Sequence, residues 1–412
     1  MKKIKQKLKV AVIGAGAAGM MAAIMAARNG VLVTVYEGMD KPGKKLLSTG
    51  NGKCNFSNMD MNLDNYYSRN EDFLARAFSQ FCVTDTIAFF EELGLYVKNK
   101  NGYLYPYCEQ AGVVWEVLKN ELINSGVKLV TGEKITRAVK GADGKFLITT
   151  SFGTIMYDRM ILACGGRTAP KTGSDGTGYL LAKEFGHKII PQVPGLGQLI
   201  CKEDYFKLIA GVRSSGHIQV YTKDNPVQEE YGEIQFTEYG ISGIPVFQVS
   251  RSINYALLNH DPVKVVIDLM PDITMEELQK RMNHRLGRAK QETVEELFTG
   301  MLNKKLMYLF IKRSGLRPDT RAKQSDKEIL SDILKLCKHL EVTVINHRGF
   351  DNAQVCAGGV CVEEITGEME SKLVPGLFFA GELMDVDGKC GGYNLQWAWT
   401  SGYIAGNAAA KI

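Results

Sequence analysis

The sequence predicts an α/β protein built on a parallel sheet, and three observations lead to this prediction. A short apolar run, Val10–Ile13, is followed at once by a glycine-rich turn and a small-residue helical stretch, Met20–Asn29. Strand and helix patterns then alternate to about residue 190, as in nucleotide-binding domains. Strand and glycine patterns return near Val342, after a region of different composition. We therefore expect a Rossmann-like domain that is discontinuous in the chain.

The turn after the first strand has the glycine spacing of a dinucleotide-binding fingerprint. Gly14 permits a tight turn, Gly16 lets the backbone approach a pyrophosphate, and Gly19 lets the helix pack against the strand. The N-terminus of that helix would direct unpaired N–H groups and its positive dipole end at the phosphates. The residues expected to line this cradle are Gly14, Ala15, Gly16, Ala17, Ala18 and Gly19.

The second strand, Val31–Tyr36, ends in an acid. Glu37 lies about 20 residues beyond the turn, where an acid accepts hydrogen bonds from a ribose 2′-OH. Because no arginine directly follows Glu37, adenosine is expected rather than a 2′-phosphate. The basic start, residues 1–7, followed by an uncharged run is also a signal-peptide pattern. Glycines at dinucleotide spacing, completed by a strand and an acid, favour the nucleotide interpretation.

Bulk composition narrows the function classes. The 50 basic and 45 acidic residues nearly balance, so no large electrostatic footprint for nucleic acid is expected. The nine cysteines contain no CxxC pair, which favours a reducing compartment, the cytoplasm, and free thiols. The six histidines show no metal-ligand spacing, so no metal is expected. We also expect a small-molecule substrate and no stable membrane association, and the sequence gives no oligomeric state.

Composition changes along the chain predict four segments. Prolines and glycines near Pro191 and Gly195 form a linker, strand-like pieces follow, and charged helical patterns occupy the region up to Leu340. Within the first segment, helical periodicity covers Asp72–Leu93. We expect the following division: 1–192, nucleotide domain, first part; 193–272, inserted β-rich unit; 273–342, inserted helical unit; 343–412, nucleotide domain, second part.

A second motif follows directly behind the ribose-binding acid. The segment Pro42–Asn55 is rich in glycine, lysine and asparagine, and can run along a pyrophosphate to reach a flavin ring. Its lysines would offset phosphate charge. An ordinary surface loop is the alternative. The residues expected to contact the cofactor are Gly43, Lys44, Lys45, Leu46, Gly50, Asn51, Gly52, Cys54 and Asn55.

A third motif is a strand that stops at paired glycines, Ile161–Gly166. Such a turn permits close backbone approach to the cofactor, although it is also found as an ordinary sharp turn. The residues assigned to the cofactor from this part of the chain are Ile135, Ala163, Gly165 and Gly166.

The fourth motif lies near the end of the chain, at 381–399. Asp385 is placed to meet ribityl or phosphate-side hydroxyls, and Gly391-Gly392 opens a helix whose first amides can face the flavin pyrimidine edge. A helix dipole there favours the reduced flavin, which carries negative charge. Ordinary helix packing is the alternative. The assigned residues are Gly381, Glu382, Asp385, Gly388, Gly392, Tyr393, Asn394 and Leu395. The four motifs together predict FAD as the cofactor.

Over essentially its whole length the chain resembles the YhiN/BaiN-type flavoproteins, also called the aminoacetone oxidase family of FAD-binding enzymes. The matching pieces are GKKLLSTGNGKCNFSN, TEYGISG at 237–243, MESKLVPGLFFAGELMDVDG at 369–388 and GGYNLQWAW at 391–399. The resemblance implies an FAD domain interrupted by a β-rich unit and a helical unit, with substrate between them and the flavin. Two departures bear on the substrate. Glu238 stands where many relatives carry histidine, and Arg167-Thr168-Ala169 replaces a Lys-Ser-Tyr-like triplet.

The resemblance leads us to expect an FAD-dependent oxidoreductase that reduces C=C bonds conjugated to a ketone in a 3-oxo bile-acid or steroid-like substrate. Tyr393 and Glu238 are the candidate proton donors. NADH or NADPH would be the electron donor, and would reach the flavin without a second dinucleotide fingerprint. One alternative is an oxidase of aminoacetone that uses oxygen. An alternative of another class is a flavin-containing nucleic-acid-binding or assembly factor, suggested by the basic stretches 280–290 and 313–323.

A redox role for cysteines is a further alternative. Cys54 and Cys390 lie in motifs assigned to the flavin, and Cys356 and Cys361 form a loose pair. A flavin-to-disulfide relay would need one activated thiolate. Free cysteine is more often a small buried apolar side chain, which we favour here.

Overall fold

The computed structural model describes residues 7–411, so the basic start of the chain lies almost entirely outside the described residues. The chain divides into two compact units. The nucleotide unit runs up to Gln192 and resumes at Gln354, and the inserted unit is Val193–Ala353. Within 7–411, no helix combines the length and apolar character needed to cross a membrane.

The nucleotide unit is built on a five-stranded parallel sheet, which confirms the predicted fold class. From β1 the chain adds β2 and β7 on one side and later adds β11 and β20 on the other. Ligands of such sheets bind at the carboxyl ends of the strands where the order reverses, here β1 and β11. In spatial order the strands are β20 (Leu377–Phe379), β11 (Arg159–Leu162), β1 (Lys9–Ile13), β2 (Leu32–Glu37) and β7 (Lys128–Thr131).

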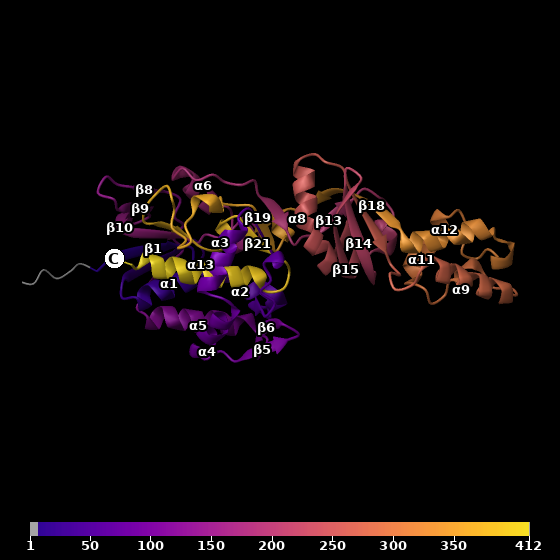
Figure 1. Ribbon diagram of the computed structural model, residues 1–412, viewed down its shortest axis with the longest axis horizontal. Helices are drawn as coiled ribbons and strands as arrows, with labels where there is room; N and C mark the ends of the chain where they lie inside the picture. The colour runs from indigo at the N-terminus through magenta and orange to yellow at the C-terminus, as the bar shows by residue number, and fades with distance from the viewer. Residues whose placement is uncertain (1–6, 412) are drawn as a thin grey trace, which may run out of the picture. The chain divides into compact units, whose positions relative to one another are not determined.

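Helices and three small sheets complete the nucleotide unit (Figure 1). The helices are α1 (Ala17–Arg28), α2 (Lys44–Ser48), α3 (Glu71–Gln80), α4 (Val83–Glu92), α5 (Ala111–Asn124), α6 (Thr177–Glu184) and α13 (Tyr393–Ala409). The paired strands are β3 (Ser57–Asn58), β6 (Tyr103–Pro106) and β5 (Val97–Lys100); β8 (Ala138–Lys140), β9 (Phe146–Thr150) and β10 (Gly153–Tyr157); and β4 (Tyr66–Ser68) with β21 (Val386–Gly388).

The single helix expected over 72–93 is wrong, because the chain forms α3 and α4 there. Phe81 is extended, with φ −155°, and ends α3. Cys82 then starts α4 with a capping box, in which its backbone N–H donates to Asp85 Oδ2 at 2.8 Å. The periodicity continues across this break because both helices bury one apolar face.

The last helix, α13, packs against the first, α1, and the two run side by side in Figure 1. Glycines make the contact. A Cβ atom at Gly402 would lie 2.5 Å from the carbonyl oxygen of Ala18, and one at Gly406 would lie 2.3 Å from that of Ala22. The two helix backbones therefore approach closely, and the end of the chain is fixed to its beginning.

The inserted unit is a closed barrel with helices that share its core. Its strands follow the order β13 (Leu199–Cys201), β16 (Gly240–Gly243), β15 (Asn225–Thr237), β14 (Arg213–Thr222), β17 (Val263–Asp268) and β18 (Leu340–His347). Its helices are α7 (Phe206–Ile209), α8 (Ile244–Leu258), α9 (Met275–Arg288), α10 (Val294–Leu297), α11 (Lys304–Arg313) and α12 (Lys327–Lys338). One apolar core runs from barrel residues such as Phe236 to helical residues such as Phe310.

Two of the expected boundaries therefore need correction. The segment 343–353 belongs to the inserted unit, because β18 closes the barrel between β17 and β13. The β-rich and helical segments also form one unit rather than two, because they bury a common core.

The α1–α13 contact predicts a matched pair of stability changes. Gly406→Ala should destabilise the protein by about 1–3 kcal/mol, because the new methyl group overlaps the Ala22 backbone. Gly112→Ala in α5, where a Cβ atom would meet nothing within 4 Å, should be neutral or about 0.5–1 kcal/mol stabilising. Urea unfolding of both variants measures the difference. Equal free energies of unfolding would show that the helices do not approach as described.

Candidate functional site

The turn between β1 and α1 is packed tightly except above one glycine. A Cβ atom at Gly14, whose φ is +103°, would lie 2.4 Å from the carbonyl oxygen of Ala163, at the end of β11. A Cβ atom at Gly19 would lie 2.0 Å from the Gly14 carbonyl oxygen. At Gly16 a Cβ atom would meet nothing within 4 Å. Helix α1 has no side-chain cap and no acid in its first turn, so its N-terminus suits an anion above Gly16.

Glu37 is held beside this turn at the end of β2. Its Oε2 accepts a hydrogen bond from Ala15 N at 2.9 Å, and its Oε1 accepts one from Met39 N at 2.8 Å. The residue is 9% exposed. Each carboxylate oxygen keeps a second lone pair, so the fixed carboxylate can still accept a ribose hydroxyl.

The two lysines of α2 each have a carboxylate partner. Lys44 Nζ lies 2.5 Å from Asp40 Oδ1, and Lys45 Nζ lies 2.5 Å from Glu382 Oε2. Lys45 also donates to Thr168 Oγ1 at 2.8 Å. These pairs neutralise the lysines that the sequence predicts to offset phosphate charge.

Two further turns meet the cradle. A Cβ atom at Gly166, after β11, would lie 2.6 Å from the Cβ of Cys356, and Gly165 packs in the same way on Ser174. A Cβ atom at Gly381, after β20, would lie 2.7 Å from the Cβ of Ala18 in α1. The turns predicted from distant parts of the sequence are thus brought together in the nucleotide unit. Ile135 lies buried in the loop after β7. Asp385 is 2% exposed, and its Oδ2 lies 3.3 Å from Arg69 Nε.

The other end of the candidate site is the start of α13. A Cβ atom at Gly392, whose φ is +95°, would lie 2.5 Å from the Ser57 carbonyl oxygen. Asn55 Oδ1, close to this glycine, is buried and has no hydrogen-bond partner among residues 7–411. Helix α13 has no side-chain cap and no acid in its first turn. An uncapped helix N-terminus and an unpaired buried amide oxygen are suited to a polar ring edge.

The remaining predicted residues line the path between these ends. Asn394 exchanges two hydrogen bonds with the backbone of Gly388, at 2.9 and 2.7 Å, which fixes the turn before α13. Gly43, with φ +69°, starts α2, and Leu46 is buried beneath it. In the loop after α2, Gly50 and Asn51 have left-handed backbone conformations. Asn51 and Gly52 are exposed, whereas Cys54 is buried. Leu395 lies in the first turn of α13.

The thiols near the site are not activated. None of the nine cysteines forms a disulfide, and burial raises the pKa of Cys54 and of Cys356 to about 12. Burial also raises the pKa of Cys390. Because a relay through a disulfide needs a thiolate near neutral pH, the structure argues against one here.

The two candidate proton donors lie in different units. Tyr393, 6% exposed, begins α13 in the nucleotide unit. Burial raises the pKa of Tyr393 to about 12. Glu238 is exposed in the turn between β15 and β16 of the inserted unit. Tyr393 is therefore the donor that shares a unit with the candidate cofactor residues.

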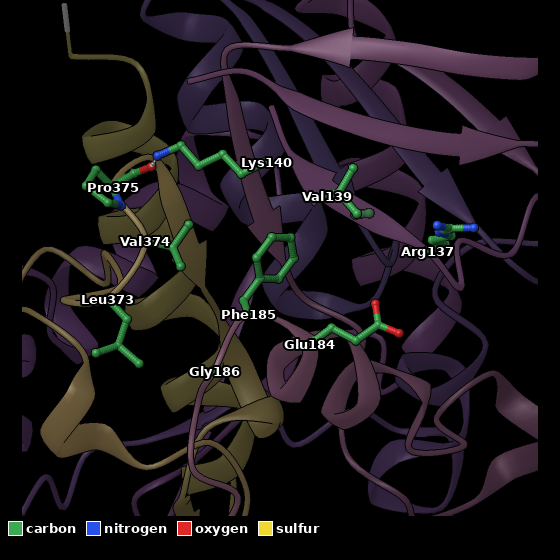
Figure 2. Close-up of a pocket in the computed structure, with 10 residues that line it drawn as sticks. Arg137, Val139, Lys140, Glu184, Phe185, Gly186, Leu373, Val374 and Pro375 are labelled. Atoms are coloured by element: carbon green, nitrogen blue, oxygen red, sulfur yellow. Dashed lines mark hydrogen bonds between the residues drawn. The ribbon is translucent and has the colours of Figure 1, made fainter. Parts of the chain in front are cut away.

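An open pocket of about 810 Å³ lies elsewhere in the nucleotide unit, between β8, the end of α6 and the loop before β20 (Figure 2). Phe185 points into it, and Lys140 reaches across to donate to the Pro375 carbonyl oxygen at 2.5 Å. None of its lining residues belongs to the four motifs. The pocket is thus distinct from the candidate cofactor residues.

Comparison with known proteins decides the family. Residues 8–408 match the HI0933-like protein Rossmann domain. The chain belongs to the HI0933-like family. It is 41% identical to a 3-dehydro-bile acid delta(4,6)-reductase of Clostridium scindens, over 98% of this chain and 99% of that protein. It is 31% identical to a ribosomal RNA dihydrouridine synthase of Haemophilus influenzae, over 95% and 96% of the two chains. The family resemblance predicted from the sequence is confirmed.

The fold of this HI0933-like protein is also found among solved structures. It resembles the 3-ketosteroid-delta4-(5alpha)-dehydrogenase of Rhodococcus jostii, with a TM-score of 0.50 and 16% identity over 100% and 99% of the chains. At that identity the likeness concerns the fold alone. The name of the Haemophilus relative concerns RNA, so the expected absence of a nucleic-acid partner stays a prediction.

The cofactor residues predicted from the sequence leave out some residues that the structure brings close to them. Thr168 is fully buried and contacts both Lys45 and Glu382. Its position just after the paired glycines Gly165-Gly166 could have indicated that it lies near the cofactor. Lys98 and Lys100 on β5 were also missed, although the Asn101-Gly102 dipeptide beside them is a strong hairpin signal.

The space above Gly16 fits the pyrophosphate of FAD, and a single variant tests this. Gly16→Ala should fold with unchanged thermal stability, since the added methyl meets no protein atom, yet bind FAD at least about tenfold more weakly. Flavin absorbance after dialysis against known FAD concentrations measures the Kd. Unchanged affinity would place the pyrophosphate elsewhere. Gly14→Ala, which clashes with Ala163, should instead lower the stability itself.

Proposed function

We propose that the protein is an FAD-dependent reductase of carbon–carbon double bonds conjugated to a carbonyl group. The observation that carries the proposal is the pair of uncapped helix N-termini, α1 and α13, joined by the four motif turns within one unit. The names of the two relatives support the bond type. A 3-oxo-Δ4,6 steroid acid and the uracil ring of uridine both contain a C=C bond conjugated to a carbonyl.

Within this class, a 3-oxo bile-acid or steroid-like acid is our leading substrate. The support is the higher identity to the bile-acid reductase, 41% against 31%, over nearly the full length of both chains. The resemblance to a 3-ketosteroid dehydrogenase adds no weight to this choice, because it concerns the fold alone.

Uridine in RNA is the second candidate, and one observation of this chain favours it. The segment 273–340 has fifteen lysines and arginines against nine acids, a net charge of +6, whereas the whole chain carries +5. Positive charge is thus concentrated on the helical part of the inserted unit. Such an uneven distribution is the electrostatic footprint of a nucleic-acid partner, although charged helix faces are also commonly just solvated.

The residues of the nucleotide unit have separate roles in this proposal. When bound, FAD supplies hydride chemistry at its ring. Glu37 holds the adenosine ribose, the N-terminus of α1 binds the pyrophosphate, and the N-terminus of α13 binds the ring. Trp397 and Trp399, in the second turn of α13, are almost fully buried.

Tyr393 is our proposed proton donor to the α-carbon of the double bond. Its raised pKa, about 12, keeps the phenol protonated throughout the neutral range. Burial and the negative charge of Asp60 both act to raise this pKa. Glu238 in the inserted unit is the alternative donor.

Reoxidation of the chemically reduced holoenzyme tests the reaction. The flavin, reduced with dithionite under anaerobic conditions, should be reoxidised rapidly by a 3-oxo-Δ4 or Δ4,6 steroid acid. Each reduced flavin saturates one double bond, so the Δ4 acid should give the saturated ketone and the Δ4,6 acid a ketone with one double bond left. The reduced enzyme is also mixed with a uridine-containing RNA, which tests the second candidate substrate. Mixing it with air measures reoxidation by oxygen, which tests the aminoacetone oxidase alternative. Rapid reoxidation by oxygen, with none by either unsaturated carbonyl substrate, would refute the proposal. NADH and NADPH are then compared as reductants of the oxidised enzyme.

Substitution of the proposed donor gives an independent test. Tyr393→Phe should slow reoxidation by the preferred substrate about 10²-fold or more, with FAD content unchanged. The matched control is Tyr66→Phe. The ring of Tyr66 contacts that of Tyr393, with centroids 5.6 Å apart, but its buried hydroxyl has no hydrogen-bond partner among residues 7–411. A Tyr393→Phe enzyme as fast as this control would exclude the phenol, and Glu238→Gln would be the next variant.

A further inference from the structure

The small sheet β3-β6-β5 carries lysines and tyrosines on one face. Strands β5 and β6 form a hairpin through Asn101 and Gly102, whose φ angles are both positive, +52° and +93°. In its register Lys98 pairs with Tyr105, and Lys100 pairs with Tyr103. Directly opposed residues of an antiparallel pair point to the same side of the sheet. Two lysines and two tyrosines therefore share a face.

Positive charge exceeds negative charge on this face. Lys98 Nζ lies 3.0 Å from Glu109 Oε1, Lys100 pairs with the same oxygen, and Lys53 Nζ lies 3.3 Å from Glu109 Oε2. Three ammonium groups thus share one carboxylate. The three lysine side chains are 35–54% exposed, whereas that of Glu109 is 21% exposed. Hydrogen bonds from Lys100 and Lys98 lower the pKa of Glu109 to about 2, so the acid stays ionised. Two positive charges are left over.

The face adjoins the turn that starts α13. Asn58 Nδ2, on β3, donates to the Gly391 carbonyl oxygen at 2.9 Å. A Cβ atom at Gly391 would lie 3.1 Å from Cε1 of Tyr103. Lys53 comes from the loop that ends at Asn55, whose buried amide oxygen has no partner within the described residues. The excess charge therefore lies beside the end of the site that we assign to the flavin ring.

We propose that Lys53, Lys98, Lys100, Tyr103 and Tyr105, the lysine–tyrosine face, bind an anionic group carried by the substrate. A carboxylate or a phosphate would share the three ammonium groups with Glu109, while the tyrosine rings provide flat apolar contact for the part of the substrate next to the anion. The inference rests on the proposed function, because the place of the flavin ring does. It adds a binding site for the negative charge of the substrate, which reduction of the double bond does not itself require.

Anion binding to the oxidised holoenzyme tests this face without turnover. The probes are a saturated C24 bile acid, its neutral methyl ester and an oligouridylate, each followed by equilibrium dialysis at two salt concentrations. Wild-type protein should bind at least one of the two anions more tightly than the ester. Lys98→Gln/Lys100→Gln should weaken that binding about three- to tenfold and reduce its salt dependence, leaving ester binding unchanged. If the double variant weakens binding of the bile acid, the face recognises a carboxylate. If it weakens binding of the oligouridylate, the face recognises a phosphate.

The matched control is Lys145→Gln, which removes a comparably exposed lysine, paired with Asp158 at 3.4 Å, from the same unit. It should leave binding of every probe unchanged. Wild-type protein that binds neither anion, or a double variant that binds both as the control does, would overturn the inference. Reduction of a neutral 3-oxo-Δ4 ester by the reduced enzyme reports on the proposed function separately. If the reduced enzyme does not reduce this ester, the result counts against the proposed reaction rather than against the lysine–tyrosine face.

Discussion

The close contact between α1 and α13 is the constraint on which the rest of the nucleotide unit depends. Because Gly402 and Gly406 carry no side chains, α13 can lie directly on the backbone of α1 at Ala18 and Ala22. The same contact holds the turn after β20. Ser401 Oγ accepts a hydrogen bond from Gly381 N at 2.9 Å, and Trp397 Nε1 donates to the Gly381 carbonyl oxygen. Segments almost 400 residues apart in the sequence are thereby held together in one unit.

The features that the sequence predicted well are the local ones. Gly14, Gly16 and Gly19 have different neighbours, and each matches the role that its spacing indicated: a tight turn, an open approach and a helix packed on the turn. The apolar run Val10–Ile13 forms the first strand, β1, within one residue of those bounds, because its pattern needs no distant partner to be recognised. Such signals are carried within a few residues, so they can be read without the fold.

The features that the sequence could not predict depend on distant partners. Lys45 was expected to face phosphate, but its partner Glu382 is 337 residues away and no local pattern links them. The boundary near residue 343 was wrong for a similar reason, because β18 belongs to the barrel only through its pairing with β13 and β17. The shared core of barrel and helices is likewise a property of packing rather than of composition. The motifs were sufficient to find turns that the fold brings together in the nucleotide unit, while the contacts of these residues with the cofactor stay a prediction.

The barrel of the inserted unit has a consequence for how this family diversifies. All six strands come from one uninterrupted stretch of chain, 199–347, and the ring they form has no free edge strand. A ring of this kind satisfies its own backbone hydrogen bonds and offers no template for aggregation. Recombination could therefore exchange the whole stretch between genes without exposing an unpaired strand. Such an exchange would leave the nucleotide unit, with its candidate cofactor residues, unchanged.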